Sequence, residues 1–220
     1  MDKENTSLII EQDELDSEQA NELLQRQDML QKEAQAVVEE LGIVAVLSRV
    51  GTVRVLGSSV LGLMTWRDID IAVSSPGITS KQAYEAVQPL LTHPHVKQGR
   101  YLNESEFYNP TGLLHDERYF FMVYYDRQSE SDWKIDISFW LAPGIHPEPI
   151  YETVKQQLTP ETRLAILRIK DVWYKLPFYR QEVSSVDIYD AVLQQGVRTL
   201  DEFDAYLSER SKPTRAGNQS

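Results

Sequence analysis

Acidic side chains recur with regular spacing in two apolar segments of the chain. Asp68 and Asp70 are separated by one isoleucine at the start of an apolar run, and Asp136 lies between isoleucines in the later run 134–140. If both runs are strands, Asp68 and Asp70 project from one face, because side chains alternate along a strand. Like charges so close repel each other unless a cation lies between them. The spacing predicts a divalent-cation site, which Asp136 completes if its strand pairs nearby.

The expected metal is Mg²⁺, as two ions. Hard cations prefer oxygen ligands, and Mg²⁺ usually keeps waters and phosphate oxygens in its coordination sphere. Two such ions about 3.5–4 Å apart hold the attacking and leaving oxygens of an in-line phosphoryl displacement. Carboxylates at these spacings suit that chemistry.

A Gly-Ser-Ser sequence precedes the acidic pair. Gly57 follows the apolar run 53–56, and Ser58 and Ser59 begin a short stretch of helical character. Glycine lets a phosphate approach the backbone, a helix N-terminus offers free N–H groups, and serine hydroxyls add donors. Gly57, Ser58 and Ser59 are therefore candidates for phosphate binding.

Each motif also has a purely structural interpretation. Gly-Ser-Ser is a common turn with a helix cap, and Asp-x-Asp is a common solvated strand edge. An aspartate in a strand also pairs readily with a neighbouring lysine such as Lys134. The functional interpretation depends on the order, spacing and strand context of the motifs together.

The run LGSSVLGLMTWRDIDIAV resembles the signature of the DNA polymerase β-like nucleotidyltransferase superfamily, and KIDISFW resembles its third-carboxylate strand. The resemblance, to an antibiotic or small-molecule nucleotidyltransferase-like member, covers roughly residues 50–140. It implies that Asp68 and Asp70 bind the metals that carry a nucleoside triphosphate (NTP) and that Asp136 completes the site. It also implies that Gly57 and Ser58 face the terminal phosphates. Arg67 directly precedes the first aspartate, where small polar residues are often found, and is a further candidate for nucleotide binding.

A locally basic stretch lies in the carboxyl-terminal part of the chain. Arg163 and Lys170 are seven residues apart and so share one helix face. The related nucleotidyltransferases follow the catalytic domain with helices that close the cleft, so Lys170 is a candidate for contacting the triphosphate. The alternative is a solvated basic face that pairs with the acidic surface.

The apolar pattern predicts the elements that position these residues. Strands are expected at 53–56, 69–73, 118–125 and 133–140, and helices at 17–41, 81–91, 162–175, 187–195 and 200–207, with a short helical stretch at 60–64. Residues 43–50 fit either a helix or the start of a strand, and residues 103–115 are expected to form a loop.

The expected fold is α+β: a nucleotidyltransferase-like mixed sheet with flanking helices, followed by a carboxyl-terminal helical subdomain. Residues 1–16 are expected to form a flexible arm, and residues 17–142 the α/β domain with its amino-terminal helix. Residues 143–207 are expected to form the helical subdomain, entered through a linker marked by Pro143, Pro147 and Pro149, and residues 208–220 a disordered tail.

Composition limits the partners. With 22 Lys and Arg against 34 Asp and Glu, the net charge is −12, which disfavours nucleic-acid binding and favours a cationic or neutral partner. The chain has no cysteine, which excludes disulfides, thiolate catalysis and Cys-ligated zinc. It also lacks an apolar run of roughly 20 residues and a signal-peptide pattern, so we expect no membrane association and a cytoplasmic location.

The expected activity is Mg²⁺-dependent transfer of a nucleoside monophosphate from an NTP to a hydroxyl of a small-molecule acceptor, with release of pyrophosphate. A cationic antibiotic such as an aminoglycoside would suit the negative net charge of the chain. Modification of such an acceptor would make the expected role antibiotic resistance. Asp136, Glu104 and Glu106 are the candidate general bases. Two alternatives stay open: a toxin-like enzyme that modifies protein or tRNA, and a non-catalytic nucleotide-binding module. The sequence decides neither the nucleotide nor the oligomeric state.

Overall fold

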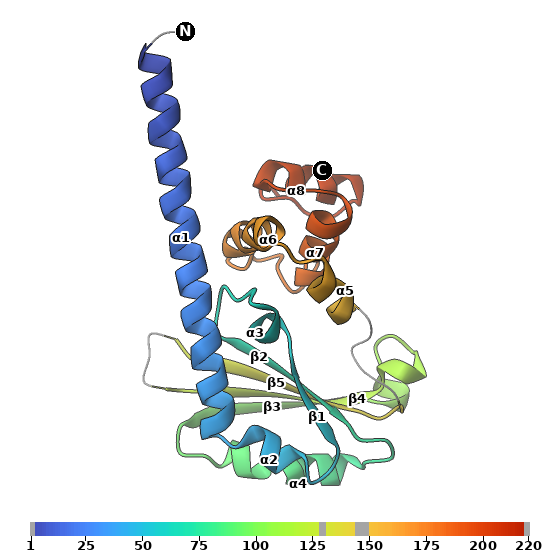
Figure 1. Ribbon diagram of the computed structural model, residues 1–220. Coiled ribbons are helices and arrows are strands. Elements are labelled where there is room, and N and C mark those ends of the chain that lie inside the picture. Colours follow the sequence, from blue (N-terminus) through green and yellow to red (C-terminus); the bar gives the residue numbers. More distant parts are fainter. Residues whose placement is uncertain (1–2, 128–130, 144–149, 218–220) are drawn as a thin grey trace. The chain divides into compact units, whose positions relative to one another are not determined.

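The computed structural model describes residues 3–127, 131–143 and 150–217 (Figure 1). The chain divides into two compact units, which we call the sheet unit (Leu30–Thr153) and the helical unit (Met1–Met29 with Val154–Ser220). The first contains a mixed sheet with flanking helices and the second consists of helices. The expected α+β class is confirmed.

Helix α1 (Lys3–Glu40) contributes residues to both units and begins earlier than expected. The sequence predicted a flexible arm over residues 1–16, whereas the structure continues the helix back to Lys3. Residues 1–41 contain neither glycine nor proline and are rich in Glu, Gln and Leu, which favour helix. The helix therefore runs until Gly42, which adopts a left-handed conformation at φ 59°.

The sheet has five strands in the order β1-β2-β5-β4-β3. They are β1 (Thr52–Leu56), β2 (Asp68–Ser74), β3 (Val96–Glu104), β4 (Arg118–Tyr125) and β5 (Trp133–Trp140). Strands β2 and β5 pair in parallel and the other neighbours pair antiparallel. The last strand in the sequence is thus the central one in space.

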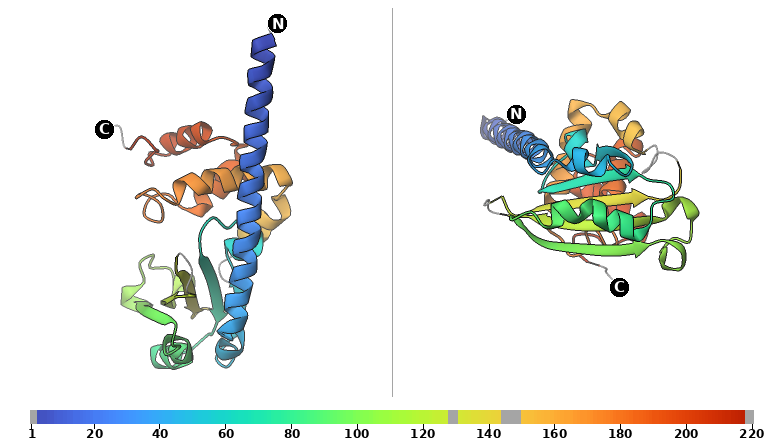
Figure 2. Two further views of the ribbon diagram at one scale, coloured as in Figure 1. Left: turned by 90° about the vertical axis from the view of Figure 1, so that its left-hand side faces the viewer. Right: turned by 90° about the horizontal axis from the view of Figure 1, so that it is seen from below.

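One face of the sheet carries the core of the sheet unit. Helices α2 (Ile43–Leu47) and α4 (Ser80–Leu91) cover this face, and the view from below in Figure 2 shows α4, in green, over the strands. The buried strand residues on this face are Ile69, Ile71, Val73, Phe121, Val123, Tyr125, Trp133, Ile135, Ile137 and Phe139. Because side chains alternate, the residues between them project from the opposite face, which we call the polar face.

Strand β3 was not predicted from the sequence. Most of its side chains are exposed and polar, because it is an edge strand that pairs only with β4. The expected loop at 103–115 begins at its end and contains two single-turn helices, η1 (Glu106–Tyr108) and η2 (Leu114–Asp116). Strand β3 lacks the apolar alternation on which sequence interpretation depends.

Helix α5 (Ile150–Gln157) spans the boundary between the units at Val154, and the helical unit also contains α6 (Pro160–Trp173), α7 (Ser185–Gln194) and α8 (Leu200–Glu209). Buried aromatic rings join α6 to α8, since Trp173 and Phe203 pack edge-to-face with centroids 5.3 Å apart. In the expected disordered tail, Arg215 Nε donates to Asp204 of α8 at 2.7 Å, so the chain is held beyond α8. Residues 218–220 of that tail, and Pro147 and Pro149 of the expected linker, lie outside the described residues. Across the described ranges, no helix combines the length and apolar character needed to cross a membrane.

Candidate active site

Three aspartates converge on the polar face of the sheet. In the parallel pairing of β2 with β5, Asp70 stands opposite Asp136 and Asp68 stands opposite Lys134. Neighbouring strands are about 4.8 Å apart, so these side chains are direct neighbours. The side chains of Asp68 and Asp136 are only 12% and 17% exposed, which places the charges in a partly desolvated environment. This is the arrangement that the spacing of the acidic residues required.

Lys134 compensates the charge of this cluster. Its Nζ lies 3.5 Å from Asp68 Oδ1 and forms a closer ion pair with Asp136 Oδ2. Over the described part of the chain, no set of three or more His, Asp or Glu side chains is arranged to enclose a metal ion. The strand register brings the three carboxylates together, and two of them converge on the ammonium group of Lys134.

Gly57 brings the backbone against the Asp70 carboxylate. Its φ of 78° and ψ of −169° belong to a region that is accessible essentially to glycine alone. A Cβ atom at this position would lie 2.0 Å from Asp70 Oδ2, so any larger residue would displace the carboxylate. A glycine is thus required here both for its conformation and for its small size.

Ser58 and Ser59 begin helix α3 (Ser58–Leu61) and differ in their hydrogen bonds. The Ser59 hydroxyl donates to the Leu56 carbonyl at 2.9 Å, which occupies its proton within the chain. The Ser58 hydroxyl makes no hydrogen bond to another residue in the described ranges and is mostly buried. Of the two candidates for donating to a phosphate, Ser58 is the better placed.

Arg67 connects the start of β2 to two other segments of the sheet unit. Its Nε donates to Glu33 Oε2 of α1 at 3.2 Å, and its Nη1 donates to Ser131 Oγ before β5 at 3.0 Å. Its carbonyl accepts from the Lys134 N–H at 3.1 Å. These contacts hold the beginnings of β2 and β5 together and so position Asp68. Glu33 and Ser131 are distant in sequence, and no local pattern marked them.

Lys170 belongs to the helical unit. It is 1% exposed in α6, and its Nζ lies 5.7 Å from the centroid of the Tyr189 ring in α7. Arg163, on the same helix, donates to Asp28 of α1 at 3.0 Å. This confirms an ion pair for one member of the basic stretch, whereas triphosphate contact by Lys170 stays a prediction.

Arg118 is the main polar-face residue that the sequence did not single out. It donates to Ser138 Oγ at 3.1 Å and to Glu104 Oε2 at 2.5 Å, and its guanidinium lies 4.4 Å from the Phe120 ring centroid. Ser138 follows Asp136 by two residues, so the strand period places it on the same face. The alternation of side chains along the two strands was the sequence signal that could have identified Arg118 and Ser138.

The strand register places two of the three candidate general bases, Glu104 and Glu106, far from Asp136. Glu104 stands opposite Arg118, which stands opposite Trp140, four residues beyond Asp136. At about 3.3 Å per residue, this places Glu104 about 13 Å along the strands from Asp136. Glu106 lies still further along, in η1 beyond the end of β3. Of the three candidates, only Asp136 lies within the aspartate cluster.

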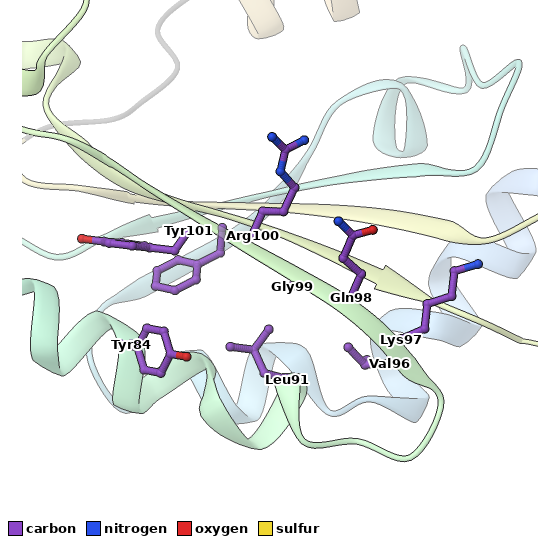
Figure 3. Close-up of a pocket in the computed structure, with 9 residues that line it drawn as sticks. Tyr84, Leu91, Val96, Lys97, Gln98, Gly99, Arg100 and Tyr101 are labelled. Carbon is purple, nitrogen blue, oxygen red and sulfur yellow. The ribbon is translucent and has the colours of Figure 1, made fainter.

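A separate pocket of about 260 Å³ lies between α4 and the edge strand β3 (Figure 3). Tyr84 and Leu91 of α4 face Tyr101 of β3 across it, and Figure 3 shows Arg100 pointing away from α4. Gly99 allows the close packing, because a Cβ atom there would lie 2.4 Å from Leu91 Cδ2. The pocket is lined by no carboxylate and no histidine, so it offers no acid–base pair for catalysis.

No protein-family model matches the chain, and no curated protein does. Among solved structures, the chain is similar to a cytoplasmic RNA terminal U-transferase, with 16% sequence identity and a TM-score of 0.47. The similarity covers 74% of this chain and 45% of that one, so the chain spans less than half the length of this neighbour. A similarity of this degree assigns neither activity nor substrate.

Proposed function

We propose that this chain is a Mg²⁺-dependent nucleotidyltransferase that moves a nucleoside monophosphate from an NTP to a hydroxyl group and releases pyrophosphate. The observation that carries this proposal is the direct pairing of Asp70 with Asp136, with Asp68 on the same face. Gly57 lets the Asp70 carboxylate lie against its backbone, and the neighbouring Ser58 hydroxyl is proposed to donate to a phosphate. Carboxylates grouped in this way suit a pair of Mg²⁺ ions.

When bound, the ions supply neutralisation of the triphosphate charge and activation of the attacking hydroxyl. Asp68 and Asp70 would hold these ions beside the triphosphate, and the Ser58 hydroxyl would donate to a phosphate oxygen. Asp136 takes the proton of the acceptor hydroxyl. The acceptor oxygen then bonds to the α-phosphorus as the bond from that phosphorus to the pyrophosphate oxygen breaks, and pyrophosphate leaves.

Two residues receive positioning roles in this proposal. Arg67 and Ser59 bind other parts of the chain through their side chains, and both lie beside the groups assigned to metal and phosphate. Arg67 holds the start of β2, which carries Asp68, while Ser59 holds α3 to the end of β1. Lys170 is proposed to contact the triphosphate on the basis of its charge, as in the sequence analysis.

For the acceptor, we propose a small molecule, with a cationic compound such as an aminoglycoside as the first to test. The net charge of −12 supports this choice, since an acidic protein attracts cations and repels the phosphate backbone of nucleic acids. If the assay described below instead shows transfer to RNA or to a component of cell extract, the acceptor is a macromolecule.

The test is pyrophosphate release in the presence of Mg²⁺, each of the four labelled NTPs and a panel of acceptors that includes aminoglycosides, RNA and cell extract. We expect release with at least one pair of substrates, and loss of about a hundredfold or more in Asp70→Asn. Asp201→Asn is the matched control, because Asp201 is a 96% exposed residue of the helical unit. Absence of release with every pair, or full activity in Asp70→Asn, would contradict the proposal.

A further inference from the structure

Lys134 lies where a cation held by Asp68 and Asp136 would have to bind. Its ammonium group forms ion pairs with both carboxylates, at 3.5 Å to Asp68 Oδ1 and closer to Asp136 Oδ2. The strand register fixes this placement, because Lys134 stands opposite Asp68 and precedes Asp136 by two residues. The lysine is therefore built into the site by the same pairing that brings the aspartates together.

We propose that Lys134 is the internal counter-ion of the metal site, which occupies the space between Asp68 and Asp136 until a divalent cation arrives together with a polyphosphate. This inference rests on the proposed function, because it assumes that the aspartates are metal ligands. It accounts for an otherwise unexpected observation: the carboxylates are grouped, yet no set of His, Asp or Glu in the described residues encloses a metal.

Electrostatics explains why such a counter-ion is needed. The side chains of Lys134, Asp68 and Asp136 are only 18%, 12% and 17% exposed, so water screens their charges poorly. Without a cation, two carboxylates so close would repel each other and strain the pairing of β2 with β5. A lysine suits a temporary role, because its charge sits on a flexible four-carbon stem and can move away without a change in the backbone.

The arrangement couples metal binding to polyphosphate binding. A divalent cation alone must displace the ammonium group from its two partners, which weakens the affinity for the metal. A polyphosphate that arrives with the cation offers the displaced ammonium new anionic partners beside the aspartates. Each ligand therefore strengthens the binding of the other, and by linkage the two enhancements are equal.

The test measures Mn²⁺ binding by electron paramagnetic resonance on the full chain, with and without tripolyphosphate. We expect Lys134→Met to bind Mn²⁺ on the order of tenfold more tightly than the wild type when tripolyphosphate is absent. We also expect tripolyphosphate to enhance Mn²⁺ binding less in Lys134→Met than in the wild type. Lys97→Met is the control, because Lys97 also forms an ion pair with an aspartate in the sheet unit, at the edge strand β3. It should leave both quantities unchanged.

Thermal unfolding provides a second measurement that does not depend on activity. Lys134→Met should unfold at a lower temperature than the wild type without metal, and Mn²⁺ should restore more of its stability than it does for the wild type. Equal or weaker Mn²⁺ binding by a folded Lys134→Met variant, checked with Lys134→Gln, would overturn the inference and identify a purely structural ion pair.

The Mn²⁺-binding measurements distinguish a failure of the proposed function from a failure of the proposed role of Lys134. If Asp68→Asn, Asp70→Asn and Asp136→Asn all bind Mn²⁺ as the wild type does, the metal site itself is wrong and the proposed function falls with it. If these variants lose Mn²⁺ binding while Lys134→Met binds it no more tightly than the wild type, the metal site stands and only the role of Lys134 is wrong.

Discussion

A Cβ atom on Gly57 would lie 2.0 Å from Oδ2 of Asp70, so the backbone of one segment is in contact with the carboxylate of another. The contact joins the Gly-Ser-Ser turn after β1 to the start of β2. It makes the position of the Asp70 carboxylate dependent on the absence of a side chain at residue 57.

Gly57→Ala is expected to lose both stability and pyrophosphate release. The unfavourable backbone conformation of an alanine at residue 57 alone lowers stability by about 1–3 kcal/mol, and displacement of Asp70 adds to this loss. Gly77→Ala is the matched control, since Gly77 shares the φ of 78° and its Cβ would meet nothing within 4 Å. Chemical denaturation of both variants separates conformational strain from the steric clash. Equal losses of stability, with activity retained in Gly57→Ala, would show that the contact with Asp70 is unimportant.

The general base is tested by comparing Asp136→Asn with Glu104→Gln. We expect Asp136→Asn to lose kcat by about a hundredfold or more, because Asp136 is proposed to take the acceptor proton. Glu104→Gln should change kcat by less than about tenfold, since Glu104 stands about 13 Å along the strands from Asp136. Steady-state kinetics with the best acceptor from the panel gives both values. A large loss of kcat in Glu104→Gln with an unaltered fold would move the base to the loop end of β3.

Alkaline pH should destabilise the sheet unit through Tyr125. Burial, together with the hydrogen bond to Glu40, raises the pKa of Tyr125 from 10.0 to about 12. Between these values the unfolded chain has lost the phenolic proton while the folded chain retains it, so the free energy of unfolding falls as pH rises. In Tyr125→Phe this decline should be shallower between about pH 10 and 12, as measured by urea denaturation. A decline of unchanged steepness would show that Tyr125 ionises alike in both states.

The stability of the helical unit should depend on the N-terminal cap of α6. The Thr159 hydroxyl accepts from the Thr162 N–H at 3.2 Å, and the Thr162 hydroxyl accepts from the Thr159 N–H at 2.8 Å. Thr159→Ala removes one of the two bonds and should cost about 1 kcal/mol of stability. Thr111→Ala, in the exposed loop between β3 and β4, is the matched comparison, because the Thr111 hydroxyl also accepts from a backbone N–H, that of Leu113 at 3.3 Å, but caps no α-helix. Equal stability of the two variants would exclude a stabilising role for the cap.

The face from which each aspartate projects was predictable from sequence, because it depends only on the regular alternation of strands. The β-branched residues beside Asp70 and Asp136 marked both strands as half-buried, and the period of two fixed the face of each carboxylate. Strands β1, β2, β4 and β5, the helices after residue 160 and the short turn at Gly57 followed from similarly local patterns. These features need no knowledge of distant residues.

Features that depend on contacts between distant residues were not predictable. The edge strand β3 exposes most of its side chains, so it lacks an apolar pattern. The clash that a side chain at Gly57 would make with Asp70 depends on the pairing of β1 with β2. The start of α1 at Lys3 was not predicted, because a polar, acidic chain end predicts a flexible arm as readily as a helix.

The strand order has a consequence for synthesis of the chain. Strand β5 is the last to leave the ribosome, yet it fills the gap between β2 and β4. Until it inserts, two unpaired edges face each other and the third carboxylate is missing, so a nascent or truncated chain exposes surfaces prone to aggregation. Completion of the sheet and grouping of the three aspartates are therefore one folding event.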